Sequence, residues 1–394
     1  MRCKFREKRK LFTLFLLFGL TSIVLTGCWD RAEVNDLALI LAAGVDKSKS
    51  ENIELSALIF IPSPKQSGQE TGMSGGSSSG RSFVRSAEGE TIADAMARLQ
   101  ESLTREIFWG QNEVLLIGEK LAKEGISDQI DFWMRHSEPR IRADVFVSNG
   151  EAKTVLKAMP ELEQDAAKQL RKIVKTHIGV KVTVKDLSQM LSGASGAAVL
   201  PWVVNLPHSQ MDTTKKTIPI ISGAAIFKQG KLAGILSDKE TRGILWTRNE
   251  MKHGVITISF KNEKGFISLN LLRSKTELTP TIKSGKWRMH IKTMADLEVI
   301  QNTTKRNLFD PKIIKEAQEK VVLEVEQRER LAFSEVQKKL NADIFGFAEE
   351  FERKYPQIWK QKKAEWNEIF PKVAVTFDTK VKIERTGLGT AKHN

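Results

Sequence analysis

Two cysteines, Cys3 and Cys28, and six histidines are the side chains best suited to covalent or metal chemistry. Two cysteines are too few for a disulfide-rich scaffold or for a zinc or iron–sulfur site built from cysteines. No pair of histidines has the spacing of metal ligands, so solvated or core histidines are the favoured interpretation. We therefore predict no metal and no cofactor. The histidines are His136, His177, His208, His253, His290 and His393.

Catalytic signatures are missing from the sequence as well. It contains no phosphate-binding glycine loop, no dinucleotide fingerprint, no HExxH zinc motif and no G-x-S-x-G serine elbow. Residues 192–196 (SGASG) include Ser195, but this serine does not have a glycine two positions away on both sides. A turn is the favoured interpretation, with a serine nucleophile as the weaker alternative. We predict that the chain is not an enzyme.

The residues before Cys28 predict a covalent lipid. Residues 1–10 carry six bases and one acid, and the nearly uncharged apolar run 11–25 follows them. This pattern is typical of a secretory signal, and the run is short for a bilayer-spanning helix, which needs about 20 apolar residues. The residues Leu25-Thr26-Gly27-Cys28 resemble the lipobox of bacterial lipoproteins. In that family the cysteine thiol, a good nucleophile, is joined to diacylglycerol.

The lipobox resemblance implies a defined processing route. The signal peptide, residues 1–27, would be cut off, and the new N-terminus at Cys28 would usually receive an acyl chain such as palmitate. Each buried methylene contributes about 0.8 kcal/mol, so two or more long chains anchor a protein stably. We expect the mature protein to work outside the cytoplasm at a membrane surface. A retained helical anchor is the alternative.

The charge and composition fit this location. The chain has 394 residues and a net charge of +14, of which residues 1–10 contribute +5 and the remainder +9. Its 41% hydrophobic and 28% charged content is that of a folded soluble protein, which argues against a disordered, fibrous or polytopic membrane chain. A basic protein beside an anionic membrane needs no nucleic acid to explain its charge, so we predict no nucleic-acid partner.

Strand-like and helix-like stretches alternate through the first half of the mature chain, which predicts a layered α/β or α+β domain. Residues 62–82 are rich in Ser, Gly and Pro and are expected to form a mobile loop. The polar segment 205–216 indicates a domain boundary. Near the C-terminus, a long helix is expected to begin at Pro311, and residues 372–385 alternate as a final strand.

One aromatic stripe lies between residues 343 and 371. Phe351, Tyr355 and Trp359 follow each other at steps of four residues, and Trp366 extends the same face. Packing of this face against the C-terminal strand is the favoured interpretation. The alternative is that these four residues bind another subunit, since large aromatic side chains bring much buried area and a polar group.

Both ends of the mature chain carry a family resemblance. Residues 27–38 (GCWDRAEVNDLA) and 43–46 (AGVD) resemble the mature start of the Ger(x)C family, the lipoprotein C subunits of spore germinant receptors. The resemblance returns in residues 341–347 (NADIFGF), in Tyr355-Pro356, Trp359, Trp366 and 369–371, and in the final 385–387.

This resemblance implies an α+β fold of three domains, each a mixed β-sheet with packed helices. We place them at residues 28–204, 205–285 and 286–394. It also implies a lipid on Cys28 and no enzymatic activity. The protein would lie on the outer face of the spore inner membrane and assemble with an A subunit and a polytopic B subunit into a nutrient receptor. A substrate-binding lipoprotein of an uptake system is the alternative, and a cell-envelope hydrolase acting through Ser195 is less favoured.

Overall fold

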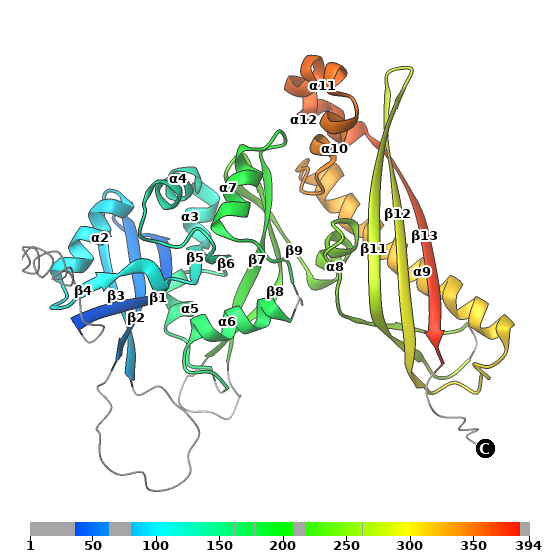
Figure 1. Cartoon of the computed structure of the whole chain (residues 1–394), viewed down its shortest axis with the longest axis horizontal. Helices are drawn as coiled ribbons and strands as arrows, with labels where there is room; N and C mark the ends of the chain where they lie inside the picture. Colours follow the sequence, from blue (N-terminus) through cyan, green and yellow to red (C-terminus); the bar gives the residue numbers. More distant parts are fainter. Residues whose placement is uncertain are drawn as a thin grey trace, which may run out of the picture.

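The structure is a computed structural model that describes residues 36–62, 80–160, 162–176, 179–207, 217–261 and 263–386. The predictions made for the signal peptide, for Cys28 and for most of segment 62–82 lie outside these ranges. Figure 1 shows the described residues as two halves side by side, each built around one β-sheet. Among these residues, no helix has the length and apolar content that crossing a bilayer requires.

The first sheet has nine strands in the order β3-β2-β1-β5-β6-β7-β8-β9, with β4 paired to β1. Its strands are β1 (Leu37–Lys47), β2 (Ile53–Pro62), β3 (Gly80–Gly89), β4 (Glu106–Phe108), β5 (Val114–Gly118), β6 (Asp144–Ser148), β7 (Ala197–Pro207), β8 (Thr217–Lys228) and β9 (Lys231–Leu236). The central run from β1 to β7 is parallel, and the strands on both sides of it are antiparallel. Strand β5 is buried throughout, as expected for a parallel strand that is covered on both faces.

Helices cover both faces of this sheet. One face packs against α2 (Ile92–Glu101), α3 (Glu119–Glu124), α4 (Ser127–Arg135) and α7 (Val184–Ser192). The other face packs against α5 (Ala152–Leu156) and α6 (Ala166–Lys175). In β1, Ala42 belongs to the second core and Ala43 to the first, because successive strand residues point to opposite faces.

The second sheet has the order β10-β11-β12-β13. Its strands are β10 (Val255–Ile258), β11 (Ile267–Lys283), β12 (Lys286–Asn302) and β13 (Ala374–Arg385). The hairpin of β11 and β12 is antiparallel, and β13 returns parallel to β12. The final strand expected from the alternating residues 372–385 is therefore confirmed, and its parallel pairing follows from the helices that separate it from β12 along the chain.

The long helix α9 (Pro311–Phe333) packs against the second sheet, and it begins at the predicted proline. Asp310 caps it by accepting a hydrogen bond from the Lys312 N–H at 2.8 Å. Ala317, Val321 and Val325 are buried at steps of four residues, which gives the helix one apolar stripe. A turn of π-helix at 334–339 ends it, and three short helices follow: α10 (Phe347–Lys354), α11 (Pro356–Lys362) and α12 (Trp366–Ile369).

The α+β class is confirmed, but the sheets do not follow the predicted domains. We expected one sheet for each of three domains, and the described residues form two. The predicted boundary between residues 204 and 205 lies inside β7, which pairs with β8 along its length. Residues 224–227 of β8 are fully buried, and such a strand needs a partner on each side to satisfy its backbone. The division into three domains stays a prediction.

Helix α8 (Asp238–Thr247) connects the two halves by packing against α9. The approach is very close at Gly243, where a Cβ atom would lie 2.2 Å from the Arg328 carbonyl oxygen and 2.9 Å from the Ala332 Cβ. Only a residue without a side chain allows this contact. The crossing therefore fixes how the second half sits on the first.

Replacing Gly243 with Ala tests this close contact. In an exposed helix the change stabilises by about 0.5–1 kcal/mol, but here the clash with backbone is expected to destabilise by about 1–3 kcal/mol. Denaturant unfolding of Gly243→Ala measures the sign, with the exposed α8 variant Lys239→Ala as control. An unchanged or raised free energy of unfolding would contradict the assigned packing.

Candidate functional site

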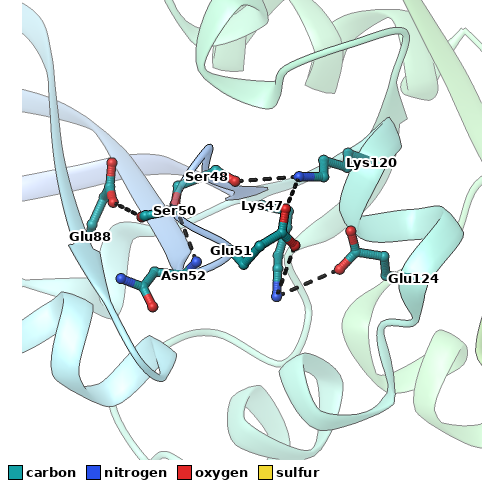
Figure 2. Close-up of polar contacts among 8 residues, drawn as sticks. All are labelled: Lys47, Ser48, Ser50, Glu51, Asn52, Glu88, Lys120 and Glu124. Atoms are coloured by element: carbon teal, nitrogen blue, oxygen red, sulfur yellow. Dashed lines mark hydrogen bonds and ion pairs between the residues drawn. The ribbon is translucent and has the colours of Figure 1, made fainter.

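A polar cluster surrounds the turn between β1 and β2, and Figure 2 shows its side chains. The Lys120 ammonium lies 2.6 Å from a Glu51 carboxylate oxygen, and Lys47 lies 4.0 Å from Glu51 and 3.6 Å from Glu124. Ser50 donates a hydrogen bond of 2.8 Å to Glu88 on β3. These contacts hold the turn between α3 and β3.

Asp46 lies behind this turn and is 3% exposed. Its two carboxylate oxygens accept hydrogen bonds from the Ala152 N–H at 2.8 Å and the Lys153 N–H at 3.0 Å, at the start of α5. Burial raises the pKa of Asp46 to about 6, while the two backbone donors act in the opposite direction. Gly118 must lack a side chain, because a Cβ there would lie 1.9 Å from the Asp46 Oδ1.

A cavity of about 660 Å³ opens beside the turn. Its lining is mostly charged and includes Lys49, Glu54, Lys123 and Glu151. Many of these charges are already paired: Lys153 with Glu54, Lys123 with Glu119 and Lys120 with Glu51. The lining offers acceptors and donors for a polar molecule but no nucleophile beside a base.

The aromatic stripe predicted from the sequence is brought together in the second half of the molecule. The rings of Trp359 and Trp366 lie 5.1 Å apart, and Phe351 lies 5.8 Å from Trp366. Trp287 of β12 joins them, with its ring 4.6 Å from Phe351. Sequence reasoning missed Trp287, which lies on a strand far away in the chain and carries no local signal of this contact.

The four side chains of this stripe differ in how far they are buried. Phe351, Trp359 and Trp366 are 0–3% exposed, whereas Tyr355 is half-buried. The three buried rings therefore pack inside the protein, and their aromatic partner on a strand is Trp287 of β12. Packing of this face against the C-terminal strand stays a prediction. A role of these four residues in partner binding stays a prediction.

Asp343 is the polar centre beneath these rings. It is 4% exposed and accepts hydrogen bonds from the Phe347 N–H (3.1 Å), the Ala348 N–H (2.8 Å) and the Trp366 Nε1 (3.2 Å). Burial raises its pKa to about 7, although the three donors favour the carboxylate. Asp343 therefore ties the start of α10 to α12, and it does so from within the predicted NADIFGF motif.

A third buried acid, Glu329 of α9, faces a row of threonines. Thr293 donates a hydrogen bond of 3.2 Å to the Glu329 Oε1, and the Thr276 hydroxyl lies 3.2 Å from that of Thr293. The Glu329 side chain is fully buried, and this burial raises its pKa to about 8. The carboxyl is therefore mostly protonated at neutral pH.

Ser195 and the histidines, whose side chains could take part in chemistry, do not form a common site among the described residues. The Ser195 hydroxyl accepts a hydrogen bond from the Ala197 N–H at 3.3 Å, which is a turn contact. His136 accepts one from the Glu138 N–H, and His290 pairs with the Thr376 hydroxyl. Among the described residues, no group of three His, Cys, Asp or Glu side chains could hold a metal ion. His177, His208 and His393 lie outside the described residues, as Cys28 does.

Two protein-family models match most of the chain. Residues 30–204 match the model of the spore germination protein N-terminal domain, and residues 222–387 match the model of the spore germination B3/GerAC-like C-terminal domain. The chain belongs to the Ger(x)C family. Asp46 of this chain lies in the first matched region, and Asp343 lies in the second.

Curated relatives match most of the chain. Spore germination protein KC of Bacillus subtilis is 28% identical over 95% of this chain and 96% of its own length. Spore germination protein B3 of the same organism is 24% identical over 93% of this chain. The spore germination protein GerQC of Bacillus cereus is 22% identical over 95% of this chain and 99% of its own length.

A solved structure has the same fold. The crystal structure of the GerBC protein superposes with a TM-score of 0.57, at 20% identity, over 87% of this chain and 97% of that chain. The curated relatives are spore germination proteins, and together with the family models they identify this chain as a germinant receptor subunit of the C type.

Replacing Trp359 with Ala separates packing from partner binding. Because the ring is 2% exposed, we expect the free energy of unfolding to fall by about 3–5 kcal/mol. Denaturant unfolding measures the loss, with the exposed neighbour Lys360→Ala as control. Unchanged stability together with weaker recovery of partner subunits would contradict the packing role.

The raised pKa of Glu329 predicts a pH dependence with a defined sign. The folded state keeps this proton up to about pH 8, whereas the unfolded chain releases it near pH 4.5. The folded state thus binds more protons in this window, so this group lowers the free energy of unfolding as pH rises, by at most about 1.4 kcal/mol per pH unit.

Unfolding curves at several pH values between 5 and 8 test this sign. Relative to the wild type, Glu329→Gln is expected to lose less stability as pH rises, since its amide does not titrate. Glu319→Gln, an exposed change on the same helix, serves as control. Identical pH profiles for the wild type and Glu329→Gln would show that the buried carboxyl does not titrate in this window.

Proposed function

We propose that the chain is a lipid-anchored, non-catalytic C subunit of a nutrient germinant receptor, needed for spore germination. The observation that carries this proposal is the full-length match to spore germination proteins, over 95% of this chain and 96% of spore germination protein KC. The family model of the C-terminal half agrees with it. These relatives favour a germination role over an uptake lipoprotein or a cell-envelope hydrolase.

The anchor in this proposal is Cys28. Its support is the sequence: a basic start, a short apolar core and Leu25-Thr26-Gly27 directly before the cysteine. With the signal removed, the lipid would hold the protein on the outer face of the spore inner membrane. There it would assemble with the A and B subunits.

A non-catalytic role agrees with the chemistry of the described residues. The buried acids Asp46 and Asp343 are occupied by backbone N–H groups, and Ser195 accepts from its own turn. Buried carboxyls with such partners hold helices in place. The subunit would therefore contribute surfaces for assembly and for signal transmission to its membrane partners.

Replacing Cys28 with Ala tests the anchor. Without the thiol no diacylglycerol can be attached, so we expect an unprocessed precursor and a strong loss of nutrient-triggered germination. Mass spectrometry of the membrane fraction and the fall in optical density of spores after nutrient addition measure both effects. Cys3→Ala is the matched control, because Cys3 would leave with the signal peptide. Normal processing and germination of Cys28→Ala would disprove the lipid assignment.

A further inference from the structure

The start of β11 and the end of β12 pair at the end of the second sheet that lies opposite α10–α12 (Figure 1). Three large apolar side chains close to these strand ends in the sequence are exposed. Phe266 directly precedes β11 and is 57% exposed, Ile300 near the end of β12 is 54% exposed, and Phe309 in the loop before α9 is 60% exposed. Single exposed apolar residues are ordinary in soluble proteins. Three at one end of a sheet, on segments joined by hydrogen bonds, indicate a surface that meets something apolar.

Lysines surround these apolar side chains. We call residues 260–266 and 300–316 the sheet tip, leaving out Asn262, which the structure does not describe. The tip carries six cations and three carboxylates, a net charge of +3. Its five lysines are exposed, and none of them forms an ion pair with any described residue. They are Lys261, Lys264, Lys305, Lys312 and Lys315.

The three carboxylates of the tip have partners other than its lysines. Glu263 and Glu316 both pair with Arg306, whose guanidinium also stacks 3.9 Å from the centre of the Phe260 ring. Asp310 caps α9. The lysines are therefore left without a counter-charge from the tip itself.

The backbone of the tip is held in place. The Thr303 N–H donates to the Phe266 carbonyl at 2.9 Å, and the Phe266 N–H donates to the Thr303 hydroxyl at 2.8 Å. Asn302 donates to the Arg306 carbonyl at 3.1 Å and accepts from the Thr304 N–H at 2.9 Å. These bonds keep Phe266 and the loop that carries Phe309 at the same end of the sheet, so the apolar groups are presented by an ordered scaffold.

We propose that the sheet tip is a second membrane contact, which inserts Phe266, Ile300 and Phe309 among the headgroups of a bilayer rich in anionic lipid. Buried apolar area and attraction between lysines and anionic headgroups are the two terms that hold such surfaces on membranes. Unpaired lysines have long, flexible side chains, so their ammonium groups can contact several mobile lipid phosphates at once. The inference rests on the proposed function in one respect, that the lipid on Cys28 brings the chain to a bilayer.

A fluorescent label at the tip reads this contact directly. The full chain with Phe309→Cys, labelled with an environment-sensitive dye, is reconstituted into vesicles of phosphatidylcholine alone or with about 30% phosphatidylglycerol. The matched control carries the label at Leu323→Cys on α9, which is 64% exposed and lies outside the tip. The parent chain without an introduced cysteine is the labelling blank. We expect a blue shift and quenching by spin-labelled lipid at position 309, only with the anionic lipid.

Charge reversal tests the electrostatic part in the same labelled chain. Lys264→Glu, Lys305→Glu and Lys312→Glu together should reduce the ratio of shielded to unshielded label at least about tenfold. The matched control reverses Lys157, Lys185 and Lys239, three exposed lysines of the first half, with the same change in net charge. Equal effects of the two triple variants would overturn the role of the tip lysines.

The outcomes for the anchor and for the tip are distinguishable. Flotation of the chain with pure phosphatidylcholine vesicles reports the Cys28 lipid alone, and its failure counts against the proposed function. The dye is read in both lipid mixtures whether or not the chain floats. A dye at position 309 that stays as solvent-exposed as the dye at 323, with excess anionic vesicles present, overturns the membrane contact and leaves an acidic protein as the occupant of the tip.

Discussion

A buried carboxylate that accepts backbone N–H groups at the start of a helix recurs in both halves of this protein. Asp46 holds α5 against the first sheet, and Asp343 holds α10 and Trp366 in the second half. Such groups bind strongly because the first N–H groups of a helix have no partner within it. Close packing follows: Gly118 has no side chain because the Asp46 carboxylate occupies that space.

The same two aspartates lie within the motifs that carry the family resemblance at the two ends of the chain, residues 43–46 and 341–347. Each motif places a charged group in the core, where it is tolerated only with every donor in position. These acids therefore act on architecture, and the cavity beside Asp46 is lined by ion pairs already made within the chain. What the protein offers to partners is its outer surface, with the predicted lipid at one end and the sheet tip in the second half.

Most local structure was predictable from the sequence, because it depends on neighbours along the chain. The start of the long helix at Pro311 and the final strand follow from helix capping and from strict alternation. The helix break between α10 and α11 at Pro356 follows from the missing N–H of proline. The sheets were not predictable in this way, since β7 and β8 pair across the polar segment that indicated a domain boundary.

The sequence by itself determined the germinant receptor family, the α+β class and the candidate lipid site at Cys28, since these depend on residue order and on local patterns. Only the tertiary structure decided which polar and aromatic groups are buried. Trp287 meets Phe351, and Asp343 meets Trp366, across stretches of chain that no local pattern connects. The sheet tip has the same origin: Phe266 and Phe309 are ordinary loop residues until the pairing of β11 with β12 brings them to one end. The physical reason is that burial and shared surface are set by contacts between distant segments, whereas capping and alternation are set within one turn or strand.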